Sequence, residues 1–383
     1  MNIPYSSRSH PIRLAPNQIH QKKYKNTTKK SDFFCQNEIY ISNRIINIPN
    51  YDQYFSPVIK SSYLKIAELH DEDLFLDQDQ EEQENQNKDH KHKQYMLLTY
   101  LDLERPVALS EAKGAGERWN SGDVSRGSYG SNDSFYQYFY NKQNQMIPKK
   151  YLLTLIDTYK YLLSSLQILH NQDIVYLNIT PKTILFDLNN KPILTTFNKS
   201  FHIQSLNGER KSNLFAKYDP SNYFLPIEIH ILCFLEQSYN TSISIMNIET
   251  VCNDYIQWGL KPLNIFSSEF IEQFKTSTIS SLQSFINKPK GEIVTGIIQQ
   301  YYKTWDKYSL SMMYFSLLTG IFNNKNKNIS KNKFVCGFSE LLIQNIHINT
   351  RKTITIQKNA SLFNEFMYSV GYEELIEIVS FFT

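Results

Sequence analysis

Long apolar runs, paired cysteines and an excess of charge of one sign are all absent from this sequence of 383 residues. No apolar stretch approaches the roughly 20 residues of a membrane-spanning helix, and the start, MNIPYSSRSHPIRLAP, lacks the apolar core of a signal peptide. The four cysteines lie far apart, so their spacing predicts neither a metal site nor a redox pair. We therefore expect a soluble protein of a reducing, intracellular compartment, without a membrane partner.

The charge balance does not indicate a nucleic-acid partner. The chain has 40 Lys and Arg residues and 37 Asp and Glu residues, whereas a nucleic-acid surface needs basic residues gathered on one face. Residues 1–32 are rich in Lys and Arg among polar residues, which predicts a loosely ordered basic arm. Nucleic-acid binding by this arm stays a minor alternative. Hydrophobic residues make up 41% and charged residues 20% of the chain, which indicates a packed core.

The first part of the chain combines one predicted helix with two predicted strands. Apolar residues recur at helical intervals over 33–46, and Asp32 is a suitable N-cap. Two loops are predicted, one of low-complexity charged sequence that we expect to be disordered and one Gly-rich linker without a phosphate-binding pattern. The strands are expected over 56–69 and 94–103, and the loops over 71–93 and 105–134.

The second part of the chain is predicted to be mainly helical around a small group of strands. Leucines on one broad face predict an amphipathic helix over 151–170. Three strands with a turn at Asn189–Asn190 follow, over 174–176, 183–187 and 192–197. Beyond Pro226 helices dominate, including 307–319, closed by Gly320, and 338–347.

Residues 168–200, ILHNQDIVYLNITPKTILFDLNNKPILTTFNKS, resemble the catalytic centre of eukaryotic-type protein kinases. In that family a long helix leads to H-R-D-L-K-P-x-N, two strands and D-F-G. Pro181 matches the proline of the first motif and Phe197 the phenylalanine of the second. The interval from Asn178 to Thr196 suits the family's spacing between its two aspartates.

Further landmarks of the same family occur in the same order. Pro226-Ile227-Glu228 resembles A-P-E, WDKYSLSMMYFSLLTG resembles the helix that carries an aspartate, here Asp306, and LLIQNIHINTRKTIT resembles the closing arginine segment, here with Arg351. Arg351 comes two residues early, and Thr350 replaces a proline. Upstream, Glu38 matches the glutamate of the regulatory helix. These signatures look most like serine/threonine kinases of large DNA viruses.

The resemblance implies an α+β, two-lobed, protein-kinase-like fold. Its reduced N-terminal lobe would span 33–104, and its mainly helical C-terminal lobe would span 135–383. The latter would carry a helical insertion at about 229–304, because the interval after Glu228 is much longer than the family's.

The residues at the catalytic-loop positions depart from the family. Tyr176 and Asn178 stand at the H-R-D histidine and aspartate, and an Asn side chain cannot accept a proton near pH 7. Thr180 replaces the loop lysine, and Thr183 replaces the metal-binding asparagine. The resemblance therefore implies that no catalytic residue is intact.

The cofactor positions depart as well. Thr196, Phe197 and Asn198 stand at D-F-G, and a hydroxyl is a poor replacement for a carboxylate toward Mg²⁺. The first glycine in the chain is Gly114, so the sequence predicts no Gly-rich phosphate loop. Lys22 or Lys23 could supply the strand lysine that pairs with Glu38. We expect no bound metal and no cofactor, with weak ATP binding as the alternative.

Three residues keep positions that are structural in the family. The resemblance implies a buried ion pair between Glu228 and Arg351, and backbone hydrogen bonds from the catalytic loop to Asp306, at the start of its helix. Two of the matched carboxylates have simpler alternatives, since Asp306 could be a plain helix cap and Glu38 a solvated helix carboxylate.

Taken together, these departures predict a catalytically inactive pseudokinase that acts as a scaffold, decoy or allosteric partner. Its protein partner would be an active kinase or a substrate of one. The first alternative is a divergent ATP-dependent serine/threonine protein kinase that uses other residues. The second is a structural virion protein that reuses the fold. If the source is viral, we expect the protein in the host cytoplasm or in the virion.

Overall fold

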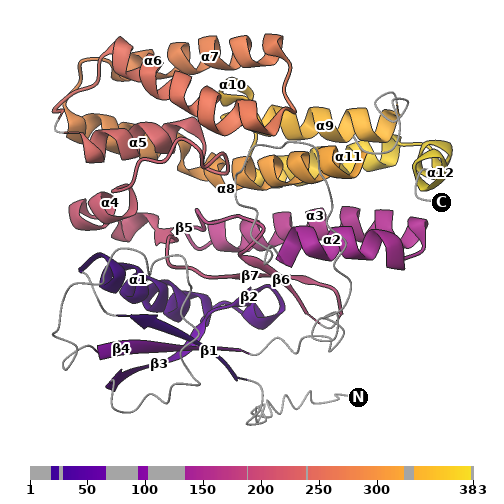
Figure 1. The fold of residues 1–383 in the computed structure, drawn as a ribbon, viewed down its shortest axis with the longest axis horizontal. Coiled ribbons are helices and arrows are strands. Elements are labelled where there is room, and N and C mark those ends of the chain that lie inside the picture. Colours follow the sequence, from indigo (N-terminus) through magenta and orange to yellow (C-terminus); the bar gives the residue numbers. More distant parts are fainter. Residues whose placement is uncertain are drawn as a thin grey trace, which may run out of the picture.

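The protein is a mixed α+β structure in which helices dominate and the sheets are small (Figure 1). The computed structural model describes residues 19–25, 29–65, 94–101, 134–187, 189–238, 240–322 and 332–380. The strands are β1 (Ile19–Lys25), β2 (Phe55–Ser56), β3 (Val58–Lys65), β4 (Gln94–Leu101), β5 (Ile174–Val175), β6 (Ile184–Phe186), β7 (Pro192–Thr195) and β8 (Phe201–His202).

The helices follow one another closely through the second half of the chain. They are α1 (Lys29–Ile45), α2 (Ser134–Gln145), α3 (Pro148–His170), α4 (Gly208–Leu214), α5 (Ile227–Gln237), α6 (Ile245–Asp254), α7 (Ser268–Leu282), α8 (Lys290–Phe322), α9 (Lys333–Ile346), α10 (Ile348–Arg351), α11 (Ile356–Ser369) and α12 (Tyr372–Ser380). A π-helical turn, η8 (Tyr255–Leu260), extends α6, and short 3₁₀ turns include η1 (Tyr51–Gln53) and η7 (Ile203–Ser205).

Three sheets organise the β structure. The first has the order β1-β4-β3, all antiparallel, and α1 packs on it at one end of the molecule (Figure 1). The second has the order β2-β7-β6, with β2 parallel to β7, and the third is the antiparallel pair β5-β8. The second and third sheets lie between the first sheet and the helices α5 to α12 (Figure 1).

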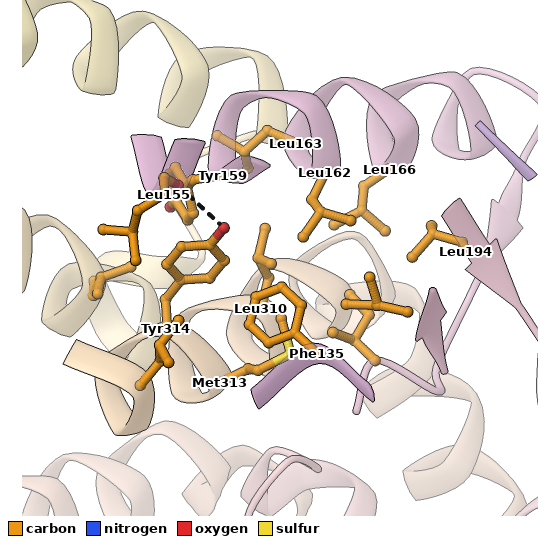
Figure 2. Packing of buried hydrophobic residues seen from close by; sticks show 14 of the residues in the cluster. Phe135, Leu155, Tyr159, Leu162, Leu163, Leu166, Leu194, Leu310, Met313 and Tyr314 are labelled. Carbon is orange, nitrogen blue, oxygen red and sulfur yellow. Dashed lines mark hydrogen bonds between the residues drawn. The ribbon is translucent and has the colours of Figure 1, made fainter. Parts of the chain in front are cut away.

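Helix α8 connects two hydrophobic cores. The C-terminal part of α8, including Leu310, Met313 and Tyr314, packs with α3 and α9 in the first core, where Tyr314 donates a hydrogen bond to the Leu155 carbonyl at 3.4 Å (Figure 2). Other residues of α8, such as Ile297 and Trp305, pack with α5, α6 and α7 in the second core. Both cores therefore depend on the same helix.

The predicted elements at the N-terminal end need three corrections. The prediction of a loosely ordered basic arm is wrong for the residues that form β1 and for the start of α1 at Lys29. Because α1 begins at Lys29, Asp32 lies within this helix and does not cap it. The strand predicted over 56–69 is interrupted, because Pro57, which has no N–H to donate, separates β2 from β3. The predicted strand over 94–103 is confirmed as β4.

Most predictions for the second part are confirmed, with one large exception. Helix α3, strands β5 to β7 and the turn at Asn189–Asn190 agree with the sequence patterns, and the interval 229–304 is helical. The helix expected over 307–319 is instead 33 residues long, so Asp306 lies in its interior and not at its start. Gly320 does not end α8, and a side chain there would collide with the Tyr140 hydroxyl of α2.

Several expectations concern residues outside the described part of the chain. The loop predicted over 71–93 and the linker predicted over 105–134, apart from Ser134, lie there. Among the helices that are described, none is both long and apolar enough to cross a bilayer. Three of the four cysteines, Cys35, Cys233 and Cys252, are buried.

Candidate functional site

The loop between β5 and β6 is held in place by the carboxylate of Asp306. Its Oδ2 accepts a hydrogen bond from the Tyr176 backbone N–H at 2.9 Å, and its Oδ1 accepts one from the Leu177 N–H at 2.8 Å. The Nε2 atom of His170 lies 2.9 Å from Oδ2. Asp306 is fully buried. The expected contact with this loop is therefore present, and the alternative of a plain helix cap is wrong.

Five of the sequence-predicted site residues form one polar cluster. The Asn178 amide donates to the Thr196 carbonyl at 3.1 Å and lies 3.5 Å from the Asn198 side-chain oxygen. The Thr183 hydroxyl donates to the Asn178 carbonyl at 2.6 Å and accepts from the Thr180 N–H at 3.1 Å. The neutral cluster, as we call these five residues, is thus connected by its own hydrogen bonds.

The neutral cluster has little capacity for metal or acid–base chemistry. Its side chains are amides and hydroxyls, which neither ionise near neutral pH nor offer the carboxylate oxygens that Mg²⁺ prefers. Within the described ranges, no group of three or more His, Cys, Asp and Glu side chains is placed to hold a metal ion. The donors and acceptors of the cluster hold the loop together, because Asn178 and Thr183 bond to backbone carbonyls.

Helix α1 is fastened to the segment that follows β7. The Glu38 carboxylate accepts a hydrogen bond from the Phe197 N–H at 3.2 Å and one from the Tyr100 hydroxyl of β4 at 2.7 Å. One residue earlier, the Asn37 amide donates to the carbonyls of Asn198 at 2.9 Å and Ser200 at 2.7 Å. Glu38 is fully buried, so the alternative of a solvated helix carboxylate is wrong.

The two candidate lysine partners of Glu38 are located only by their backbones. Strand β1 precedes α1, and its residues Lys22 and Lys23 pair with Leu98 and Leu97 of β4. Their side chains lie outside the described part of the chain, so the pairing of either lysine with Glu38 stays a prediction.

Aromatic rings fill the space behind the neutral cluster. Phe197 packs edge-to-face against Tyr176, with ring centroids 5.4 Å apart, and against Phe55 of β2, at 6.2 Å. The Tyr176 hydroxyl donates to the Thr195 carbonyl, and burial raises the pKa of this phenol far above its ordinary value. Tyr176 is therefore a neutral hydrogen-bond donor that stabilises the loop.

Two non-glycine residues at this site adopt left-handed backbone conformations. Leu177 has φ 53° and Thr196 has φ 64°, and such values are unfavourable for side chains that are bulky or β-branched. Hydrogen bonds hold both in place, from Leu177 N–H to Asp306 and from Asn178 to the Thr196 carbonyl. Strained residues of this kind concentrate at functional sites.

The expected ion pair between Glu228 and Arg351 is present. Arg351 Nη2 lies 2.5 Å from Glu228 Oε1, and both side chains are almost completely buried. The guanidinium also lies over the Tyr308 ring, 4.8 Å from its centroid. The pair connects the start of α5 to α10.

Sequence analysis did not identify Lys307 of α8 as a site residue. Its ammonium donates to the carbonyls of Arg351, at 2.7 Å, and Ile354. Burial and the nearby charge of Arg351 lower the pKa of Lys307 to about 7. Asn37 and His170 were likewise missed, because a polar residue on a helix gives no sequence signal until its tertiary partner is known.

No protein-family model matches the sequence, and no curated protein matches it.

Proposed function

We propose that this chain is a protein-kinase-like protein without phosphoryl-transfer activity, a pseudokinase that acts by binding another protein. The observation that carries the proposal is the neutral cluster. In kinases, phosphoryl transfer depends on a catalytic-loop aspartate, on metal ligands from the loop asparagine and the D-F-G aspartate, and on a strand lysine paired with a helix glutamate. At the first three positions this chain has Asn178, Thr183 and Thr196.

The contacts around the cluster support the resemblance in fold. Asp306 binds the backbone of the loop, Glu228 pairs with Arg351, and Glu38 of α1 reaches the N–H of Phe197. These three relationships join residues more than 120 positions apart in the sequence. The proposal is supported by residues that have the types expected in a kinase framework and make the expected contacts, whereas the residues at the reactive positions are neutral.

A binding role follows from this contrast. The loop is fixed by hydrogen bonds and aromatic packing that need no metal and no nucleotide. A segment that is ordered before binding loses less conformational entropy when a partner binds to it. We propose an active kinase, or a substrate of one, as that partner.

A thermal-shift titration tests the proposal. A ligand that binds only the folded state stabilises it, by about 2.7 kcal/mol at 100 times its Kd. We expect no Mg²⁺-dependent or Mn²⁺-dependent shift with millimolar ATP for the natural protein. The variant Asn178→Asp/Thr183→Asn/Thr196→Asp should gain one, while Gln172→Glu, which adds a charge at an exposed turn, should not. Metal-dependent phosphorylation by the natural protein that Asn178→Ala abolishes would contradict the proposal and favour a divergent kinase.

A further inference from the structure

Two arginines and two hydroxyl groups converge where α1 meets the segment from β8 to α4. Arg210 of α4 lies over the Tyr40 ring of α1, 4.0 Å from its centroid, and donates to the Ser205 hydroxyl at 3.3 Å. Arg44, one turn after Tyr40, lies 5.0 Å from the same centroid and donates to the Tyr40 hydroxyl at 2.8 Å. Figure 1 shows α4 beside α1 at this edge of the molecule.

Neither guanidinium is neutralised by the residues that the structure describes. Arg351 has a carboxylate at 2.5 Å, whereas among the described residues no Asp or Glu oxygen lies within 4.0 Å of Arg44 or Arg210. Glu209 precedes Arg210 in α4, and Asp173 accepts a hydrogen bond from the Gln204 side chain at 3.3 Å, but neither forms an ion pair with Arg44 or Arg210. Two positive charges thus share one partly exposed place without an anion.

The segment that carries Ser205 also contains a buried imidazole. His202 of β8 is 8% exposed, and its Nδ1 has no hydrogen-bond partner within the described part of the chain. Its backbone carbonyl accepts from the Ser205 hydroxyl at 3.0 Å, so the ring and the hydroxyl belong to one short segment. Burial, together with the charge of Arg44, lowers the pKa of His202.

The surroundings of Tyr40 change the pKa of its hydroxyl. Burial alone would raise the pKa of Tyr40, but hydrogen bonds with Ser205 and Arg44 and the charges of Arg44 and Arg210 outweigh burial and lower it. The surroundings of Tyr40 therefore favour negative charge. Guanidinium groups bind phosphate oxygens through paired, charge-assisted hydrogen bonds, and hydroxyl groups add further donors.

We propose that Arg44, Arg210 and Ser205 form a binding site for a phosphate monoester. The dianion would pair with the two guanidinium groups, and the Ser205 hydroxyl would turn from the His202 carbonyl to donate to it. It comes from a phosphorylated side chain of a partner protein or from free phosphate, since both present the same oxygens. The site goes beyond the proposed function and does not depend on it, because none of its residues belongs to the neutral cluster.

Calorimetric titration of the full chain tests this site. The probes are inorganic phosphate and a blocked peptide containing phosphoserine, each compared with chloride at the same ionic strength. We expect saturable phosphate binding that Arg44→Gln and Arg210→Gln each weaken about tenfold or more. Lys303→Gln removes an exposed cation that also lies over a tyrosine ring, that of Tyr302 at 5.6 Å, and should leave binding unchanged.

Each outcome decides the proposal. Tighter binding of the phosphopeptide assigns the site to a phosphorylated partner, and equal or tighter binding of inorganic phosphate assigns it to the free anion. Binding no stronger than that of chloride, or phosphate binding that both arginine variants retain, overturns it. The proposed function fails separately, on a metal-dependent ATP shift that Arg44→Gln does not alter. A metal-independent ATP shift that Arg44→Gln removes belongs to this site.

Discussion

The carboxylate of Glu38 accepts a hydrogen bond from the backbone N–H of Phe197 at 3.2 Å, across 159 positions of sequence. This contact joins the helix that packs on the first sheet to the segment that closes the neutral cluster. The position of α1 is therefore fixed by the same residues that hold the loop.

Replacing Glu38 should loosen this connection. Glu38→Ala leaves the Phe197 N–H and the Tyr100 hydroxyl without this acceptor inside the core, and we expect a loss of about 2–4 kcal/mol in the free energy of unfolding. Glu38→Gln keeps one side-chain oxygen and should lose clearly less. Urea denaturation measures both, and equal losses for the two variants would argue against the hydrogen bonds as the cause.

The Glu228–Arg351 pair should show strong coupling. Either Glu228→Leu or Arg351→Met leaves a buried charge without its partner, which typically costs about 3–5 kcal/mol. The double variant removes both charges, so its loss should be smaller than the sum of the two. A double-mutant cycle by chemical denaturation measures the difference, and additive losses would contradict an energetic interaction between the two side chains.

Acid should destabilise the protein through His230. Burial lowers the pKa of His230 to about 4, although hydrogen bonds to the Asn222 and Leu225 carbonyls and the charge of Asp219 oppose the shift. The unfolded chain binds the proton below about pH 6.5. Stability is therefore full above that pH and falls by up to about 3 kcal/mol as the pH drops to about 4. In His230→Gln this part of the pH dependence should vanish, and an unchanged pH profile would rule out His230 as its source.

Two glycines should respond in opposite directions to the same substitution. In the π-helical turn η8, a Cβ on Gly259 would lie 2.8 Å from the Pro220 carbonyl oxygen, so Gly259→Ala should cost about 1–3 kcal/mol. A Cβ on Gly291, in the first turn of α8, meets nothing within 4 Å. Gly291→Ala should therefore stabilise the protein by about 0.5–1 kcal/mol. Thermal denaturation of both variants checks the sign, and equal effects would contradict the close approach of η8 to Pro220.

Local patterns were sufficient to predict the elements around the neutral cluster. Helix α3 has a continuous apolar face, and strands β6 and β7 are short apolar runs separated by an Asn-rich turn. The order of motifs along the chain then predicted the partners of Asp306 and Glu228, because the resemblance assigned each residue a neighbour.

Other features depend on tertiary contacts that no local pattern contains. Strand β1 is hidden in a basic, polar stretch, and its partner β4 comes some 70 residues later. The burial of Glu38 follows from its contacts with Phe197 and Tyr100, not from its own helix. The approach of Arg44 and Arg210 to one tyrosine ring joins two helices far apart in the chain.

The position of α8 between two hydrophobic cores has a consequence for dividing the protein into fragments. A fragment that ends before Lys290 lacks the α8 residues of both cores. A fragment that begins at Lys290 lacks the residues of α3, α5 and α6 that pack against this helix. Neither piece can bury its apolar surface alone. Halves divided at Lys290 and expressed separately should therefore each lack an ordered interior, and mixing the two halves should restore it.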